Sequence, residues 1–569
     1  MTVQQQNLPS SKPEEHHIHF DMRRFVREHI LRSWLLAVWL VVLTYITAVI
    51  TWGQLQSATV VTAVVILIWA VTLIMTVYNE LRHKHNPMTL WLKANLYSSI
   101  TNVLLTLLLT LLIFAGIRSF FDYAFTRANF SPIPEVSDAW EASYAETGQE
   151  PGANWGAVID NMRNMLVFRY PQEESWRLYA VLGYLGVMLL ASTVVYSQER
   201  FRRSRLRRAM NILWVLTPII TFGLLLGVAV QPELVMETLI TSVVSIAVLG
   251  GLFFFTKWVT TQYPVAWLGL VMGLIWVAML AGALYLIVGN FSVKLNPDQA
   301  WGGLLLTMII AVFAIVASFP LGVLLALGRR SHIRGVPAWL TYGSTALLTL
   351  YFLVTSTLPG LQDPANLFAI ILALWPLAIP VAAYLFQKYF KGNVVAAFCT
   401  VYIEVIRGVP LITVLFMSII LFPILLPKGT EVLSTWRVMV AAAMFASAYL
   451  AENVRGGLQA IPRGQYEAAE SIGLSTVQKY RLIVLPQAIR VVIPAIVGQF
   501  IGLFKDTTLI AIVGLVEFLG VANLISAQTD WLGVRREPYI FLMLIYFAGS
   551  WVMAASSRRM EKQMGVGER

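Results

Sequence analysis

The chain has 569 residues, of which 58% are hydrophobic and 12% are charged, and its mean hydropathy is +0.70. A water-soluble protein of this composition would expose far more apolar surface than it can cover, so the composition indicates an integral membrane protein. The net charge of +11 comes from short Lys/Arg groups beside apolar runs, a pattern that argues against nucleic-acid binding and is typical of cytoplasmic loops.

Apolar runs of the length that a bilayer-spanning helix needs, about 20 residues, recur along nearly the whole chain. The short alternating strands of a membrane β-barrel do not occur. The sequence therefore predicts an all-α polytopic membrane protein with about 14 transmembrane helices in a lipid bilayer. The expected spans lie near 34–52, 58–78, 96–117, 177–196, 210–230, 238–256, 264–289, 302–328, 337–357, 367–388, 406–427, 437–457, 488–512 and 539–556.

Residues 1–33 are polar and arginine-rich, and we expect a cytoplasmic tail. The first apolar run is long enough to span, which predicts no cleavable signal peptide. His16, His17 and His19 have no second ligand group nearby in the sequence, so we expect no metal site. Cys399 is the one cysteine of the sequence, which excludes an intramolecular disulfide.

A multi-span region is expected at 34–289, with one sizeable external segment at 118–176. This segment carries more acids than bases, and its prolines and glycines predict a loop. Two roles stay open for this segment. It either caps the path or contacts a binding protein, or it is a solvated connector.

Orientation follows from the basic clusters, which mark cytoplasmic loops. With fourteen spans every cluster falls on one side of the membrane and 118–176 falls on the other. Both termini, including a C-terminal tail at 557–569, are then expected in the cytoplasm.

A polar segment at 458–487 separates two late spans and falls on the basic side. Pro462 ends the preceding span, Tyr466 to Ile472 predicts a short amphipathic helix, and a left-handed Gly473 is expected to end it. The alternative is an ordinary interfacial loop. The residues that form a spaced pattern here are Glu467, Ala468, Ala469, Gly473, Ile483, Leu485 and Pro486.

This pattern, E-A-A, three residues, G, nine residues and I-x-L-P, resembles the cytoplasmic signature of membrane subunits of ABC importers. Three further runs, V-I-R-G-V-P-L-I-T-V-L-F at 405–416, F-A-S-A-Y…E-N-V-R-G-G at 445–457 and F-I-G-L-F-K-D-T-T-L at 500–509, are similar to the permeases of polar and general L-amino-acid importers. The resemblance covers about 300–556. It reaches upstream to W-L-K-A-N-L-Y-S-S at 91–99 and F-R-Y-P at 168–171.

The resemblance implies a type I ABC importer permease core of about five helices within 300–556. Members of that group have about eight spans, so the surplus is expected as three hairpins near 34–78, 238–289 and 337–388. The last of these would interrupt the core. Added pairs of spans leave the orientation of the 458–487 coupling loop unchanged.

In that family the E-A-A helix docks on an ATPase and transmits its motion. The resemblance thus implies a non-enzymatic transport subunit in the inner membrane of a prokaryote. The chain contains no Gly-Lys pair and so no phosphate-binding loop, and we expect it to bind no cofactor, with ATP and Mg²⁺ on the partner. Further expected partners are an extracytoplasmic amino-acid-binding protein and a second permease subunit. The resemblance favours a heterodimer and leaves a homodimer open.

Ionisable residues within spans are costly and often functional. Glu452 is a candidate contact for a substrate ammonium, with an ion pair to Arg455 as the alternative. Arg407 has lipid snorkelling as its alternative, and Ser/Thr hydroxyls often bond back to their own helix. The candidate path residues are Arg407, Gly408, Pro410, Glu452, Lys505, Asp506, Thr507 and Thr508.

Two other classes of function fit parts of the sequence less well. An ion-coupled secondary transporter would use Glu452 or Asp506 as its coupling acid, but it leaves the E-A-A segment without a purpose. A membrane enzyme would need a cluster of catalytic side chains at one membrane face, and none is evident.

Overall fold

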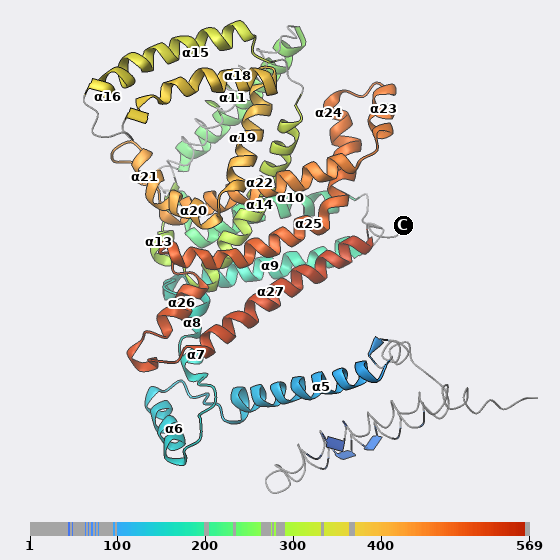
Figure 1. Ribbon diagram of the computed structural model, residues 1–569, viewed down its shortest axis with the longest axis vertical. Coiled ribbons are helices and arrows are strands. Elements are labelled where there is room, and N and C mark those ends of the chain that lie inside the picture. Colours follow the sequence, from blue (N-terminus) through green and yellow to red (C-terminus); the bar gives the residue numbers. More distant parts are fainter. Residues whose placement is uncertain are drawn as a thin grey trace, which may run out of the picture. The chain divides into compact units, whose positions relative to one another are not determined.

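The computed structural model describes residues 99–197, 204–230, 235–262, 291–331, 335–362, 370–371 and 373–563, with isolated positions between 42 and 96 and at 275–279. These residues are almost entirely helical. Their one sheet has two strands, β1 (Val228–Val230) and β2 (Phe291–Val293), which pair antiparallel with Val228 opposite Val293. The predicted all-α polytopic class is confirmed (Figure 1).

Eight of the described helices are long and apolar enough to cross a membrane, and a ninth candidate is a pair bent by 105°. The expected spans near 34–52, 58–78 and 264–289 lie almost wholly outside the described residues, so the count of fourteen stays a prediction. The eight helices are Leu104–Thr126, Gln172–Tyr196, Arg205–Leu226, Val235–Val259, Gly303–Arg329, Ala338–Leu361, Thr476–Val513 and Arg536–Glu561.

The chain divides into two compact units, residues 1–128 and 129–569. In the first unit, α5 (Ile100–Phe121) begins after Ser99, whose hydroxyl accepts a hydrogen bond from Asn102 N at 3.2 Å. It continues into a π-helical turn, η2 (Asp122–Thr126), which is closed by an ion pair of 2.8 Å between Asp122 and Arg127.

The second unit begins with a folded segment where the sequence predicted a loop. Residues 129–176 contain α6 (Pro134–Thr147), α7 (Gly156–Asp160), α8 (Met162–Val167) and η3 (Gln172–Glu174). The loop interpretation is wrong here because Pro134 occupies the first turn of α6 and Gly148 ends it at φ +66°, which are the places where helices favour these residues.

The core of the second unit is built around α14 (Gly303–Arg329), which packs along α22 (Ser434–Ala460) (Figure 1). Helix α14 also contacts α8, α19 (Val394–Gly408), α25 (Leu485–Asp506) and α26 (Phe518–Ile525). The helices after α8 are α9 (Ser175–Ser197), α10 (Arg205–Leu226), α11 (Val235–Gln262), α13 (Pro297–Ala300), α14 (Gly303–Arg329), α15 (Ala338–Phe352), η6 (Leu353–Thr357), α16 (Leu358–Gln362), η7 (Trp375–Leu377), α18 (Ala378–Phe390), α19 (Val394–Gly408), α20 (Leu411–Phe416), η8 (Met417–Leu421), α21 (Phe422–Leu425), α22 (Ser434–Ala460), α23 (Arg463–Ser471), α24 (Thr476–Lys479), η9 (Tyr480–Val484), α25 (Leu485–Asp506), η10 (Thr507–Val513), α26 (Phe518–Ile525), η11 (Thr529–Trp531) and α27 (Arg536–Gln563).

Helices α15 and α18 lie side by side in the region of the expected third hairpin (Figure 1). Gln387 on α18 donates to Val336 O at 3.1 Å, and Val336 N donates to Gly392 O at 2.9 Å, which closes the base of this pair. The chain then bends by 105° between Trp375–Phe390 and Val394–Gly408 and re-enters the core as α19.

Two of the buried clusters within the second unit matter for the site. One, at the Arg329 end of α14, joins Ala326, Leu450, Val484 and Ala488. The other, near the Gly303 end, includes Met165 and gathers side chains from α7, α8, α26 and α27. The folded 129–176 segment thus shares its core with the last two helices.

Candidate functional site

The Glu467 segment connects α22 to α25 through a helix–turn–helix. Pro462 has the extended backbone (φ −57°, ψ 141°) that starts α23 at Arg463, three residues before the expected start. Gly473 has φ +76°, which lets Gly473 N donate to Glu470 O at 2.9 Å and Leu474 N to Ala469 O at 3.1 Å. These two bonds satisfy the carbonyl groups at the end of α23.

Helix α23 is fixed on one face and open on the other. Ala469 is 1% exposed, and the Tyr466 hydroxyl donates to Leu458 O at 3.0 Å while its ring meets the Tyr480 ring at 6.3 Å. Glu467 and Ala468 are exposed. Within the described part of the chain, the Glu467 carboxylate makes no hydrogen bond or ion pair, so it is available to a partner.

The second half of the pattern anchors the loop to α25. Ile483 and Leu485 are half-buried and Pro486 is exposed, whereas Val484, at the position that the pattern leaves free, is completely buried. A groove of about 1020 Å³ lies beside the loop. Its lining includes Glu467, Pro486, and the basic side chains Arg330, Arg463, Lys479 and Arg481.

An ion cluster lies two helical turns before the loop on α22. Arg455 Nε donates to both Glu452 oxygens at 3.0 and 2.9 Å, so the alternative that the sequence offered for Glu452 is present. Arg407 Nη1 and Arg329 Nη1 lie 3.6 and 3.8 Å from Glu452 Oε2, and Arg329 also pairs with Glu404 at 2.8 Å. The cluster joins α14, α19 and α22.

The Arg407–Pro410 segment forms the break between α19 and α20. The Arg407 guanidinium lies 5.8 Å from the centre of the Tyr449 ring, so it faces α22 rather than extending away from the protein as a snorkelling arginine would. The Tyr449 hydroxyl donates to Arg407 O at 3.4 Å, close to the end of α19 at Gly408. Pro410 has an extended backbone and precedes α20.

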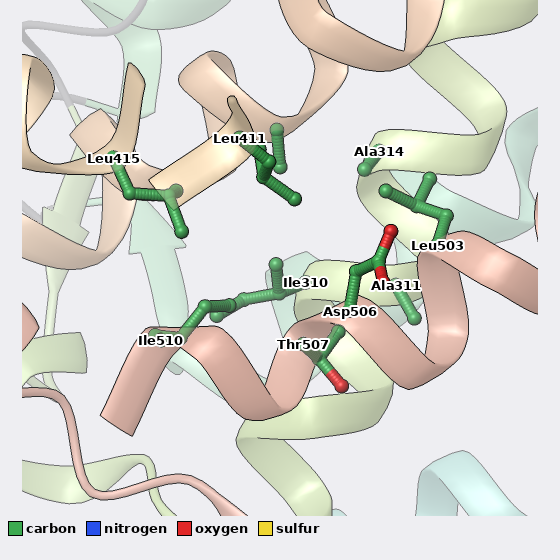
Figure 2. A pocket seen from close by; sticks show the side chains of 10 residues that line it. Ile310, Ala311, Ala314, Leu411, Leu415, Leu503, Asp506, Thr507 and Ile510 are labelled. Carbon is green, nitrogen blue, oxygen red and sulfur yellow. The ribbon is translucent and has the colours of Figure 1, made fainter. Parts of the chain in front are cut away.

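A separate cavity contains two more of the candidate path residues. The Asp506 carboxylate points into a space of about 10 Å³ among apolar side chains of α14, α20, α22 and α25, and the Thr507 hydroxyl points away from it (Figure 2). Thr507 Oγ1 donates to Phe504 O at 2.7 Å and lies 3.2 Å from the Tyr546 hydroxyl. Such a volume holds about one water molecule. Asp506 itself is an exposed residue, so the cavity is small but not sealed from the surface. Its lining is Ile310, Ala311, Ala314, Leu411, Leu415, Ala442, Leu503, Asp506, Thr507 and Ile510.

Lys505 and Thr508 line neither the cavity nor the ion cluster. Lys505 is exposed, and Thr508 Oγ1 donates back to Lys505 O at 2.9 Å. The candidate path residues therefore separate into a charged group on α19 and α22 and an Asp506 group on α25.

Comparison with known proteins identifies the family. Residues 365–565 match the family described as binding-protein-dependent transport system inner membrane component. The glutamate/glutamine/aspartate/asparagine transport system permease protein BztC of Rhodobacter capsulatus is 32% identical over 489 residues, which cover 83% of this chain and 93% of BztC. The chain belongs to the amino-acid ABC transporter permeases.

A second relative supports the same family over nearly the same length. The inner membrane amino-acid ABC transporter permease protein YhdY of Escherichia coli is 28% identical over 485 residues, covering 85% of the permease and 95% of YhdY. A crystal structure of an amino acid ABC transporter with histidines aligns with 46% of the permease and 92% of its own chain, at 24% identity and a TM-score of 0.31. The multi-pass membrane character of this permease agrees with the name of YhdY and with the apolar helices of the described residues.

Three polar groups of the permease core were not predicted. Arg437 on α22 donates to Ile419 O at 2.7 Å in the π-helical turn η8. Asn453 Nδ2 donates to Gln499 Oε1 at 2.8 Å, and Gln499 Nε2 donates to Ala446 O at 2.7 Å, which links α22 to α25. Their sequence signal was their polarity within apolar runs, the same signal that selected Glu452.

The third group is Glu517, which lies between the last two candidate spans and is completely buried. Its carboxylate accepts from Leu519 N and Gly520 N at 2.9 Å and from Thr307 Oγ1 at 3.3 Å, and it caps α26. Burial raises the pKa of Glu517 to about 7, although these hydrogen bonds oppose the change.

The described residues of the permease contain no group of three His, Cys, Asp or Glu side chains placed to hold a metal ion. The histidines at positions 16, 17 and 19 lie outside those residues.

Proposed function

We propose that this permease forms the translocation path of an ATP-driven importer of polar L-amino acids and is driven through α23 by a separate ATPase. The observation that carries this proposal is the geometry of α23. One face is fixed by Ala469, Tyr466 and the Gly473 turn, while Glu467 is exposed and without a partner among the described residues. A helix fixed in this way transmits a push or pull to the helices behind it.

Apolar exposure beside Glu467 supports a protein partner there. Ile472, beside Gly473, is 72% exposed, and Val477, in the first turn of the Thr476–Val513 helix, is 74% exposed. In this proposal these two side chains and the Glu467 carboxylate form the surface that the ATPase contacts. The loop and both termini then lie in the cytoplasm.

The ion cluster provides the mechanical route from the loop to the path. Helix α22 runs without a break from Ser434 to Ala460, about 40 Å at 1.5 Å per residue. Glu452 ties it to Arg329 on α14 and Arg407 on α19. Movement of α23 would therefore displace three helices together, and two of them line the Asp506 cavity.

The proposed substrate class is supported by the names of the relatives and by Asp506. BztC is named for glutamate, glutamine, aspartate and asparagine, and a further relative from Bacillus subtilis is named a probable glutamine permease. Asp506 is an exposed acid that lines a largely apolar cavity, a position suited to the ammonium group that all amino acids share. A second permease subunit, an extracytoplasmic binding protein and the partner-bound ATP and Mg²⁺ complete the proposed importer.

The test uses the permease reconstituted in liposomes with its ATPase, second permease and binding protein. Glu467→Lys should weaken the docking contact, and Gly473→Val should strain the φ +76° turn that closes α23. Both are expected to abolish ATP-driven uptake while the chain still inserts in the membrane. Gly464→Ala is the matched control, because a methyl group at Gly464 meets nothing within 4 Å.

Unchanged uptake by the Glu467 and Gly473 variants would contradict the coupling assignment. Uptake driven by an ion gradient without ATP would instead support the secondary transporter that the sequence left open.

A further inference from the structure

The Gly303 end of α14 is held between two segments that are distant in the sequence. On one side, Gly303 N donates to Val516 O at 3.0 Å, next to the Glu517 cap of α26. On the other side, residues 164–168 lie against Gly302 and Gly303. A Cβ atom on Gly302 would lie 2.5 Å from Phe168 Cδ1, and one on Gly303 would lie 2.4 Å from Met165 O.

Phe168 adopts a backbone conformation that non-glycine residues rarely take, with φ 50° and ψ −120°. Its neighbours hold it there. Phe168 N donates to Asn164 O at 2.9 Å, Arg163 Nη2 donates to Tyr170 O at 2.6 Å, and the buried Tyr170 hydroxyl donates to Leu225 O at 3.2 Å. Strain that is maintained by fixed neighbours on both sides often marks a functional position.

The clamped end of α14 leads directly to the Asp506 cavity. Ile310 and Ala311, which line the cavity, lie seven and eight residues after Gly303, about 10 to 12 Å along the helix. Between them, Thr307 Oγ1 accepts from Phe518 N at 3.2 Å and donates to Glu517. The same two turns of α14 therefore contact Phe168, α26 and the cavity.

We propose that Phe168 is a positioning residue of the permease, which presses on Gly302 to hold α14 against α26 and thereby keeps the Asp506 cavity small. The cavity widens when this contact is released. The consequence for transport rests on the proposed function, whereas the effect on the cavity does not.

The first test measures access to the cavity in the purified full-length permease. The buried Ala311 is replaced, Ala311→Cys, in a Cys399→Ala background, and the introduced thiol is labelled with a small membrane-permeant maleimide. Phe168→Gly removes the ring and tolerates φ 50°, so we expect several-fold faster labelling. Gly302→Ala displaces the ring by its methyl group and is expected to act in the same direction.

The double variant distinguishes positioning from general loosening. Once Phe168→Gly has vacated the space, the Gly302→Ala methyl group has room, so the double variant should label no faster than Phe168→Gly alone. Gly343→Ala on α15 is the control, because its methyl group meets nothing within 4 Å. Unchanged labelling in Phe168→Gly, or effects of the two substitutions that add, would overturn the proposal.

The second test uses the reconstituted importer. Phe168→Gly is expected to raise ATP hydrolysis several-fold in the absence of binding protein and to lower uptake per ATP hydrolysed, with Gly343→Ala unchanged. A merely structural role would lower both activities in proportion to assembled protein. If the unaltered importer shows no ATP-driven uptake, the proposed function fails, and the labelling test still decides the role of Phe168.

Discussion

The two ends of α14 are held by opposite kinds of contact. At the Arg329 end, a half-exposed arginine lies 2.8 and 3.8 Å from the carboxylates Glu404 and Glu452. At the Gly303 end, backbone and ring atoms of residues 164–168 lie so close to the helix that neither Gly302 nor Gly303 has space for a methyl group. One end is held by charge and the other by close packing.

This difference indicates different mechanical behaviour. Partly exposed ion pairs exchange partners at little cost, typically about 1 kcal/mol or less, so the Arg329 end can follow a moving α22 without separating from it. A close-packed contact does not deform gradually and is either made or broken. The charged end thus suits continuous transmission from the coupling loop, and the packed end suits a two-state closure.

The largest effect is expected at the packed end, as a dependence of stability on pH. Burial raises the pKa of Glu517 from 4.5 to about 7, so the folded state holds this proton more tightly than the unfolded chain. The contribution of Glu517 to the free energy of unfolding should therefore be greatest below pH 4.5. It should fall by about 3 kcal/mol as pH rises through 7. Unfolding temperatures of the purified chain in detergent at several pH values would measure this.

Glu517→Gln should remove most of that pH dependence, whereas Glu141→Gln on the exposed face of α6 should leave it in place. An equally steep fall of stability in the Glu517 variant would show that another group loses the proton. Glu517 would then not be the acid that causes the pH dependence.

A smaller effect, sensitive to salt, is expected at the charged end. Glu452→Gln keeps the shape of the side chain but removes the charge that faces Arg329, Arg407 and Arg455. Because Glu452 is 23% exposed, we expect a loss of about 1–2 kcal/mol at low ionic strength and less in about 1 M salt. Unfolding temperatures at both salt concentrations test this.

Glu404→Gln serves as the comparison, since Glu404 pairs with Arg329 alone among the ion pairs of the described residues. A loss in Glu452→Gln that is the same at both salt concentrations would mean that packing, rather than charge, holds this end.

The charged end and the coupling loop were largely accessible from the sequence, because their signals are local. Pro462 and Gly473 mark the limits of α23 within a few residues, and the cost of an acid in an apolar run singles out Glu452. The pair with Arg455 follows from a spacing of three residues on one helix.

The packed end could not be predicted in this way. Its contacts join positions as far apart as Thr307 and Glu517, separated by 210 residues, and no periodic pattern reports such a contact. Glu517 also lies outside the predicted spans, where an acidic residue is common and gives no signal of a special role. The loop predicted at 118–176 failed for a related reason: Pro134 and Gly148 serve as helix ends there, and the same residues also form turns.

The smallest predicted effect concerns how firmly the charged end is connected to the coupling helix. Tyr466→Phe removes the 3.0 Å hydrogen bond to Leu458 O but keeps the ring that meets Tyr480. We expect a loss of about 1 kcal/mol and a modest rise in ATP hydrolysed per substrate transported, because α23 moves with less of its motion passed to α22. Tyr480→Phe keeps the same ring pair without removing that bond and is the matched control. If both variants couple as well as the unaltered permease, ring packing and the burial of Ala469 suffice to fix α23, and the charged end receives its motion without this hydrogen bond.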